Sequence, residues 1–99
     1  MELDVQTTNV ADGWAVRLRV SLDRAETNEL FLAGDKLVAW PTEGMRSSGG
    51  AVPLERSSMF LSEIVAKPEG LELAYETQEL AERTQKILAY QVRAAFPAD

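Results

Sequence analysis

Two copies of an Arg-Ser-Ser triplet are the most direct indication of chemistry in this chain. They are Arg46-Ser47-Ser48 and Arg56-Ser57-Ser58, and Gly49-Gly50 lies between them. Two guanidinium groups, four hydroxyls and a bare glycine backbone can hold a phosphate or a carboxylate by charge-assisted hydrogen bonds. The segment is not a P-loop, because no Gly-Lys-Ser/Thr follows it. The triplets therefore predict an anion-binding loop, with a solvated polar loop as the alternative.

A second set of charged residues is acidic and has no basic residue among its members: Glu69, Glu72, Glu76, Glu79 and Glu82. Carboxylates are the ligands that Mg²⁺ and Ca²⁺ prefer. The spacing is not that of an EF-hand loop, however, and it spans a predicted strand and a predicted helix whose side chains point apart. We therefore expect a solvated acidic face and no metal site.

Four further residues are candidates for a protein interface. Arg17 and Arg19 place positive charge on the outer face of a predicted strand, which suits an acidic patch on a partner. Trp40 precedes Pro41 at a strand end, and Tyr90 lies off the apolar stripe of a predicted helix. Aromatic side chains anchor many protein interfaces. The alternatives are an ordinary exposed sheet face for the arginines and a cap on the core for Trp40.

The composition restricts the classes of function. The chain has 99 residues, enough for one domain, and contains no Cys and no His, which removes disulfides, thiolate metal sites and His-activated nucleophiles. The net charge is −6, which disfavours direct contact with nucleic acid or an anionic membrane. We expect a non-enzymatic protein without cofactors. A cytoplasmic location is expected because no secretory or membrane-spanning segment is evident.

The elements that position these residues begin with a β-hairpin over residues 2–23. Asp12-Gly13 is typical of a two-residue type I′ turn. Such a turn places Leu3 opposite Leu22 and gathers alternate residues of both strands on one face: Leu3, Val5, Thr7, Asn9, Ala11, Trp14, Val16, Leu18, Val20 and Leu22. That face requires an apolar partner layer, because a slip of one residue would expose it all.

A second hairpin is predicted from two apolar runs. Gly34-Asp35 suits a type II′ turn that joins strands over residues 30–33 and 37–40. Pro41 ends the second of these strands because it has no N–H to donate. Residues 41–50 then form a long loop.

Three shorter segments complete the predicted sheet. Residues 51–54 are a short extended piece, which Pro53 confines to an edge. Residues 58–66 fit either a strand or two helical turns, and the strand is preferred. Residues 71–75 alternate between apolar and polar side chains and predict another strand.

A long helix is predicted over about residues 78–96. Thr77 can cap its start and Pro97 stops it. Apolar and small residues form one stripe along it: Leu80, Ala81, Thr84, Ile87, Leu88, Val92, Ala95 and Phe96. This helix is the expected partner layer of the hairpin. The predicted fold class is α+β, an antiparallel β-sheet or partly open β-barrel of about five to seven strands with one long C-terminal helix.

The C-terminal third resembles the end of PilZ domains. It reads as strand, turn, strand and helix, over residues 60–66, Pro68-Glu69-Gly70, 71–75 and 77–90, and Gly34-Asp35-Lys36-Leu37-Val38 is also similar to a strand entry in that family. The resemblance implies a small β-barrel that binds cyclic di-GMP. The family's binding motif is Arg-x-x-x-Arg followed by Asp/Asn-x-Ser-x-x-Gly. The chain has no Arg-x-x-x-Arg, and Asn9-Val10-Ala11-Asp12-Gly13 lacks the Ser, so no ligand-binding residue is assigned from the resemblance.

The first hypothesis for function is a protein-binding or accessory module, such as a bacterial or phage inhibitor, adaptor or assembly protein. Its partner would be another protein, or a second copy bound through a sheet edge or the outer face of the helix. One alternative is a degenerate PilZ-like barrel or a receptor for an anion or nucleotide at residues 41–58. A further alternative is an acidic inhibitor that mimics nucleic acid.

Overall fold

The computed structural model describes residues 1–48, 52–53 and 55–96. Its elements, in chain order, are β1 (Glu2–Val10), β2 (Gly13–Ser21), α1 (Arg24–Ala33), β3 (Leu37–Ala39), β4 (Met45–Ser48), β5 (Ser58–Phe60), α2 (Leu61–Val65), β6 (Leu71–Tyr75) and α3 (Gln78–Ala95). The predictions for Gly49, Gly50 and Pro97, and for residues 51 and 54 of segment 51–54, fall outside the described residues.

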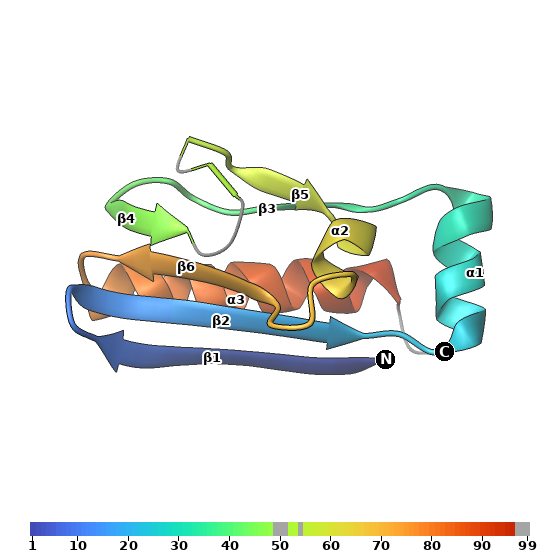
Figure 1. Cartoon of the computed structure of the whole chain (residues 1–99), viewed down its shortest axis with the longest axis horizontal. Helices are drawn as coiled ribbons and strands as arrows, with labels where there is room; N and C mark the ends of the chain where they lie inside the picture. The colour runs from blue at the N-terminus through green and yellow to red at the C-terminus, as the bar shows by residue number, and fades with distance from the viewer. Residues whose placement is uncertain (49–51, 54, 97–99) are drawn as a thin grey trace.

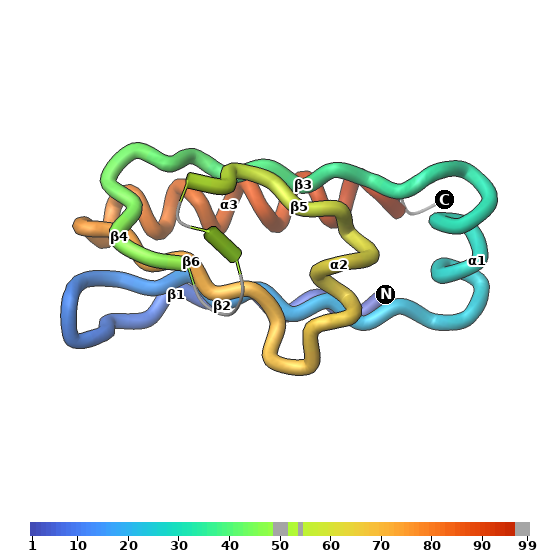
Figure 2. The backbone as a smooth tube through the Cα atoms, turned by 45° about the horizontal axis from the view of Figure 1, so that its top comes forward, coloured from blue at the N-terminus to red at the C-terminus, as the bar shows by residue number. Residues whose placement is uncertain are grey.

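The strands form two antiparallel sheets. The larger has the order β1-β2-β6-β4, and the smaller pairs β3 with β5. Helix α3 runs lengthwise along one face of the larger sheet, and α1 lies at the end of the molecule opposite the β1–β2 turn (Figures 1 and 2). The α+β class is confirmed. Of the two predicted forms, the described strands make open sheets.

The N-terminal hairpin is confirmed, but its turn lies one residue earlier than predicted. Val10 pairs with Gly13, so the turn residues are Ala11 and Asp12, and Leu3 lies opposite Val20 instead of Leu22. Gly13 belongs to β2, where it has a positive φ of 140° and lies against β6. Because the partners shift by two residues, every side chain keeps its predicted face. The apolar face is therefore correct although the pairing is not.

The core forms between this face and α3. Val16, Leu18 and Val20 on β2 are buried, and so is the stripe of α3: Ala81, Thr84, Leu88, Ala89 and Val92. Each buried Val or Leu contributes about 1.5–3 kcal/mol through loss of water contact. The buried Thr84 hydroxyl donates a 3.0 Å hydrogen bond to the Leu80 carbonyl, so the helix itself satisfies it. The predicted partner layer is confirmed. No helix among the described residues is long and apolar enough to cross a membrane.

The predicted second hairpin is wrong, because its first strand is part of helix α1. Asp23 and Glu26 form a capping box at the start of α1: the Asp23 carboxylate accepts from the Glu26 amide at 2.8 Å, and Glu26 accepts from the Asp23 amide at 3.0 Å. These two bonds satisfy helix N–H groups that would otherwise have no partner. The local cap starts a helix that the apolar run alone did not indicate. β3 consequently pairs with β5.

The segment 58–66, predicted as either a strand or two helical turns, contains both a strand and a helix. Residues 58–60 form strand β5, and the helix α2 follows at once over residues 61–65. The preference for a strand throughout is therefore wrong beyond Phe60. The change occurs because Asp35, which follows α1, accepts a 3.2 Å hydrogen bond from the Ser62 amide at the start of α2. That acceptor comes from a distant part of the chain. The predicted strand 71–75 and helix over about 78–96 are confirmed as β6 and α3.

Gln91 attaches the small sheet to α3. Its carboxamide accepts a 3.0 Å hydrogen bond from the Ala39 amide and donates a 2.6 Å hydrogen bond to the Ala39 carbonyl. The backbone N–H and C=O groups of Ala39 on β3 point away from β5. Backbone groups alternate in direction along a strand, and those of the next residue, Trp40, face the other way, where its N–H donates to the Ser57 carbonyl at 2.9 Å. One side chain of the helix thus occupies both backbone groups of an edge residue.

Gly13 provides a test of the close packing between the hairpin and β6. A Cβ atom at Gly13 would lie 2.3 Å from the Tyr75 carbonyl oxygen, whereas one at Gly34, which also has positive φ, would meet nothing within 4 Å. Gly34→Ala should cost only backbone strain, about 1–2 kcal/mol. Gly13→Ala should lower the free energy of unfolding by about 2 kcal/mol more, measured by urea denaturation. Equal losses in the two variants would contradict this packing.

Tyr75 makes stability depend on alkaline pH. Its side chain is fully buried and donates a 2.5 Å hydrogen bond to the Pro41 carbonyl. Burial raises the pKa of this phenol above its ordinary value of 10.0. Above about pH 10 the unfolded chain therefore loses a proton that the folded chain keeps, and the free energy of unfolding falls as pH rises.

The Tyr75→Phe variant should isolate this effect. It should be about 1 kcal/mol less stable than wild type at pH 7, because the hydrogen bond is lost. Between pH 9 and about pH 11 its free energy of unfolding should fall less than that of wild type. Urea denaturation across this pH range measures both. Parallel pH profiles would show that the phenol ionises as readily in the folded chain as in the unfolded one.

Candidate functional site

Helix α1 has an unusual distribution of apolar residues. Only Leu30 is buried, whereas the neighbouring Phe31 and Leu32 are 88% and 83% exposed. The helix is held by its capping box, by the buried Leu30 and by the ion pair of Glu26 with the Met1 amino group at 2.9 Å. Gly34 follows its last residue at positive φ. Large apolar side chains exposed together on a small protein typically mark an interaction surface.

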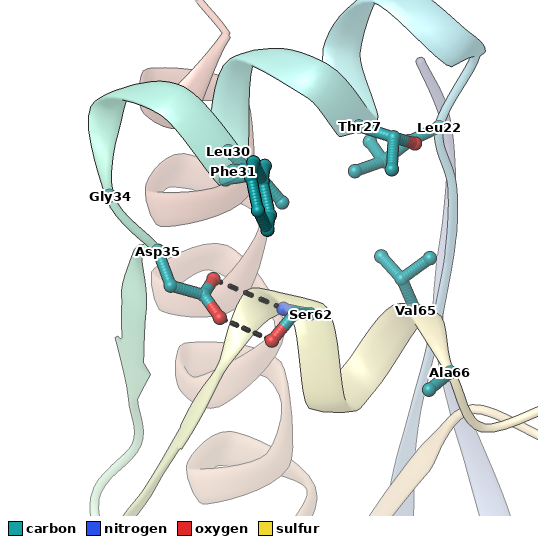
Figure 3. A pocket seen from close by; sticks show the side chains of 9 residues that line it. All are labelled: Leu22, Thr27, Leu30, Phe31, Gly34, Asp35, Ser62, Val65 and Ala66. Atoms are coloured by element: carbon teal, nitrogen blue, oxygen red, sulfur yellow. Dashed lines mark hydrogen bonds between the residues drawn. The ribbon is translucent and has the colours of Figure 1, made fainter.

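An apolar pocket of about 460 Å³ lies between α1 and α2, and the exposed Phe31 is part of its lining. Figure 3 shows Leu30 and Phe31 of α1 on one side of it, Val65 of α2 opposite, and Leu22 at the end of β2. The complete lining is Leu22, Thr27, Leu30, Phe31, Gly34, Asp35, Ser62, Val65 and Ala66. The pocket is large enough for one or two apolar side chains.

Asp35 brings one negative charge to this pocket. Its carboxylate accepts hydrogen bonds from the Ser62 amide at 3.2 Å and from the Ser62 hydroxyl (Figure 3). It also accepts from the Lys36 amide at 2.9 Å. These bonds fix the carboxylate at the wall. None of the ion pairs formed within the described ranges includes Asp35. The pocket therefore combines an apolar lining with a fixed carboxylate, an arrangement that suits an apolar side chain beside a cation.

The two Arg-Ser-Ser triplets lie on different sheets. Arg46 and Ser47 are exposed on β4, where they border the β1–β2 turn. Ser48 donates to the Val52 carbonyl at 2.7 Å. Ser57 is exposed beside β5, which begins at Ser58.

The guanidinium group of Arg56 is already engaged. Its Nη2 atom lies 3.1 Å from both carboxylate oxygens of Glu63, and its Nε atom donates to the Ser58 carbonyl at 2.7 Å. An anion at Arg56 would compete with Glu63. The described residues thus place the two arginines in separate local networks, and the anion-binding loop remains a prediction that includes Gly49 and Gly50.

The four interface candidates differ in exposure. Arg17 and Arg19 lie on the outer face as predicted, and Arg17 pairs with Glu72 at 2.7 Å. Both partners of this pair are exposed, so it contributes at most about 1 kcal/mol. Tyr90 is 75% exposed on α3, as expected for a residue off the stripe. Trp40 is only 4% exposed and donates to the Arg56 carbonyl at 3.2 Å, which corrects its assignment to an interface: it is a core residue.

No group of three or more acidic residues in the described ranges is placed to hold a metal ion. Sequence reasoning missed Phe31, Leu32 and the pocket beside them, because it placed residues 30–33 in a strand. The Asp-x-x-Glu pattern at Asp23 and Glu26 was the available signal for a helix. With α1 in place, Leu30 takes the inner side and Phe31 is left outside.

Comparisons with known proteins identified no relative of this chain. No protein family matches it, and neither the curated proteins nor the solved structures include a significant match. The function is therefore argued from the geometry of the described residues.

Leu30 and Phe31 provide a test of how α1 is oriented. Leu30→Ala should lower the free energy of unfolding by about 2 kcal/mol, because a buried side chain is lost. Phe31→Ser should change it by less than about 0.5 kcal/mol, because the ring is already in water. Urea denaturation compares the two directly. A Phe31→Ser loss as large as that of Leu30→Ala would mean that Phe31 packs inside the protein.

Proposed function

We propose that this chain is a non-enzymatic protein-binding module and that α1 and its pocket form the docking surface. The observation that carries the proposal is the exposure of Phe31, which lines the pocket with Leu22, Leu30 and Val65, and of the next residue, Leu32. Covering each exposed side chain would contribute about 1.5–3 kcal/mol. Clustered apolar anchors of this kind account for most of the binding energy in many interfaces.

The partner that suits this surface is a protein segment with an apolar side chain next to a Lys or Arg. The apolar side chain would enter the pocket, and the cation would approach the Asp35 carboxylate, whose geometry is fixed by Ser62. The chain's net charge of −6 would also attract a basic partner before contact. A second copy is less suitable, because a symmetric dimer would bring two Asp35 pockets toward each other.

The test uses a partner captured from cells of the source organism by a photo-crosslinking residue at Thr27, which lines the pocket. After the partner is purified, its Kd is measured for wild type and for three variants. Phe31→Ser with Leu32→Ser should weaken binding by about 30-fold or more. Leu37→Ser, the matched control on β3, also removes an exposed apolar side chain and should stay within about threefold of wild type. Asp35→Asn should weaken binding and reduce its salt dependence.

An unchanged Kd in the Phe31 and Leu32 double variant would refute the docking surface. Sedimentation of the chain alone tests the competing occupant. Dimerisation of the wild type that disappears in the double variant would identify a second copy as the occupant of the pocket and would overturn the assignment to a different protein.

A further inference from the structure

The outer edge of β1 is a second surface suited to recognition. β1 is nine residues long and pairs only with β2 among the described strands. The Gln85 carboxamide donates to the Val5 carbonyl at 3.4 Å, so this carbonyl points away from β2. Leu3 and Thr7 present their backbone groups on the same side, because pairing alternates along an antiparallel strand. Such an edge is a template for an added strand.

A groove of about 690 Å³ lies between this edge and α3. Leu3, Asp4 and Val5 line it from the strand. Lys86, Tyr90 and Arg93 line it from the helix, so two cations face one carboxylate. These three helix residues are exposed, and neither cation takes part in an ion pair with any described residue. The groove is thus more basic than the acidic chain as a whole.

The spacing of the three helix residues is shorter than that of alternate residues in an extended peptide by about 3 Å in all, a difference that the long Lys86 and Arg93 side chains can span. Lys86, Tyr90 and Arg93 follow one another at four and three residues, which places them about 6 Å and about 4.5 Å apart along the helix axis. Side chains on one face of a strand recur about every 6.8 Å. Three successive inward side chains of a bound strand would therefore meet a cation, an aromatic ring and a cation.

We propose that the groove between β1 and α3 binds an extended peptide with the pattern acidic-x-apolar-x-acidic. The peptide pairs with the backbone of Leu3, Val5 and Thr7, and it displaces the Gln85 carboxamide from the Val5 carbonyl. Its two carboxylates meet Lys86 and Arg93. Its apolar side chain lies against Tyr90. A second copy of β1 does not fit as well, since the residues it would direct at α3 are uncharged: Leu3, Val5, Thr7 and Asn9. This surface is separate from the α1 pocket, and either can fail without the other.

The probe is a fluorescent peptide with the core Thr-Glu-Thr-Leu-Thr-Glu-Thr, and anisotropy measures its Kd. Wild type should bind it saturably below about 1 mM. Lys86→Glu with Arg93→Glu should weaken binding by about tenfold or more. Arg24→Glu with Arg83→Glu is the matched control: it makes the same change in charge outside the groove and should stay within about threefold of wild type. A peptide with Lys in place of Glu should prefer the groove variant.

A separate experiment tests whether the peptide pairs with the β1 backbone or binds through side-chain contacts alone. Two peptides carry N-methyl groups on alternate residues, so that one peptide blocks the N–H groups facing β1 and the other blocks those facing away. One peptide should lose binding by about tenfold or more while the other retains it. The amide resonances of Leu3, Val5 and Thr7 should shift on titration. The proposal is overturned by the absence of saturable binding at about 1 mM, by equal affinities for the groove variant and its control, or by two N-methyl peptides that bind alike.

Discussion

The contact between α3 and the apolar face of the β1–β2 hairpin is the interaction on which the other elements depend. The buried stripe of the helix covers Val16, Leu18 and Val20, and β6 extends the same sheet, burying Leu71, Leu73 and Tyr75. A two-stranded hairpin alone is marginal in water, so this layer makes the sheet stable. The second sheet is attached to the same helix through Gln91 and Ala39.

Both proposed surfaces lie at the boundary of the core between α3 and the larger sheet. α3 covers the larger sheet along its length, and α1 lies at one end of the molecule with only Leu30 inside (Figure 1). The consequence is an apolar pocket between two short helices that the main core does not fill. At the sheet margin, α3 and β1 diverge enough to leave a groove. One surface is apolar with a single carboxylate, and the other is basic beside a strand edge that no described strand pairs with, so they would select different partners.

The sequence predicted the parts of the fold that local patterns determine. The alternation of Val16, Leu18 and Val20 and the stripe containing Ala81, Leu88 and Val92 were sufficient to pair hairpin and helix. The turn residues did not predict which residues of β1 and β2 lie opposite one another. Gly13 is not a turn residue; it allows β2 to approach β6 closely. Residues that are adjacent in the sequence cannot reveal a neighbour about 60 positions away.

The candidate site was less predictable for the same reason. The start of α2 depends on Asp35, and the pocket depends on α1, α2 and the end of β2 meeting in space. Tyr90 could be placed outside from its position on the helix alone, whereas the burial of Trp40 depends on segments that surround it after folding. The two triplets have the same sequence, but the fold does not bring them together. Arg56 pairs with Glu63, whereas Arg46 lies beside the β1–β2 turn.

The bond between Gln91 and Ala39 has a consequence for assembly. A side-chain amide offers one donor and one acceptor, the same pair that a neighbouring peptide unit would offer to a strand. Gln91 therefore imitates an adjacent strand at this position and terminates the small sheet there. A chain with several short strands risks polymerising through their open margins. Here α3, which forms the core with the larger sheet, also blocks the β3 edge of the small sheet at Ala39.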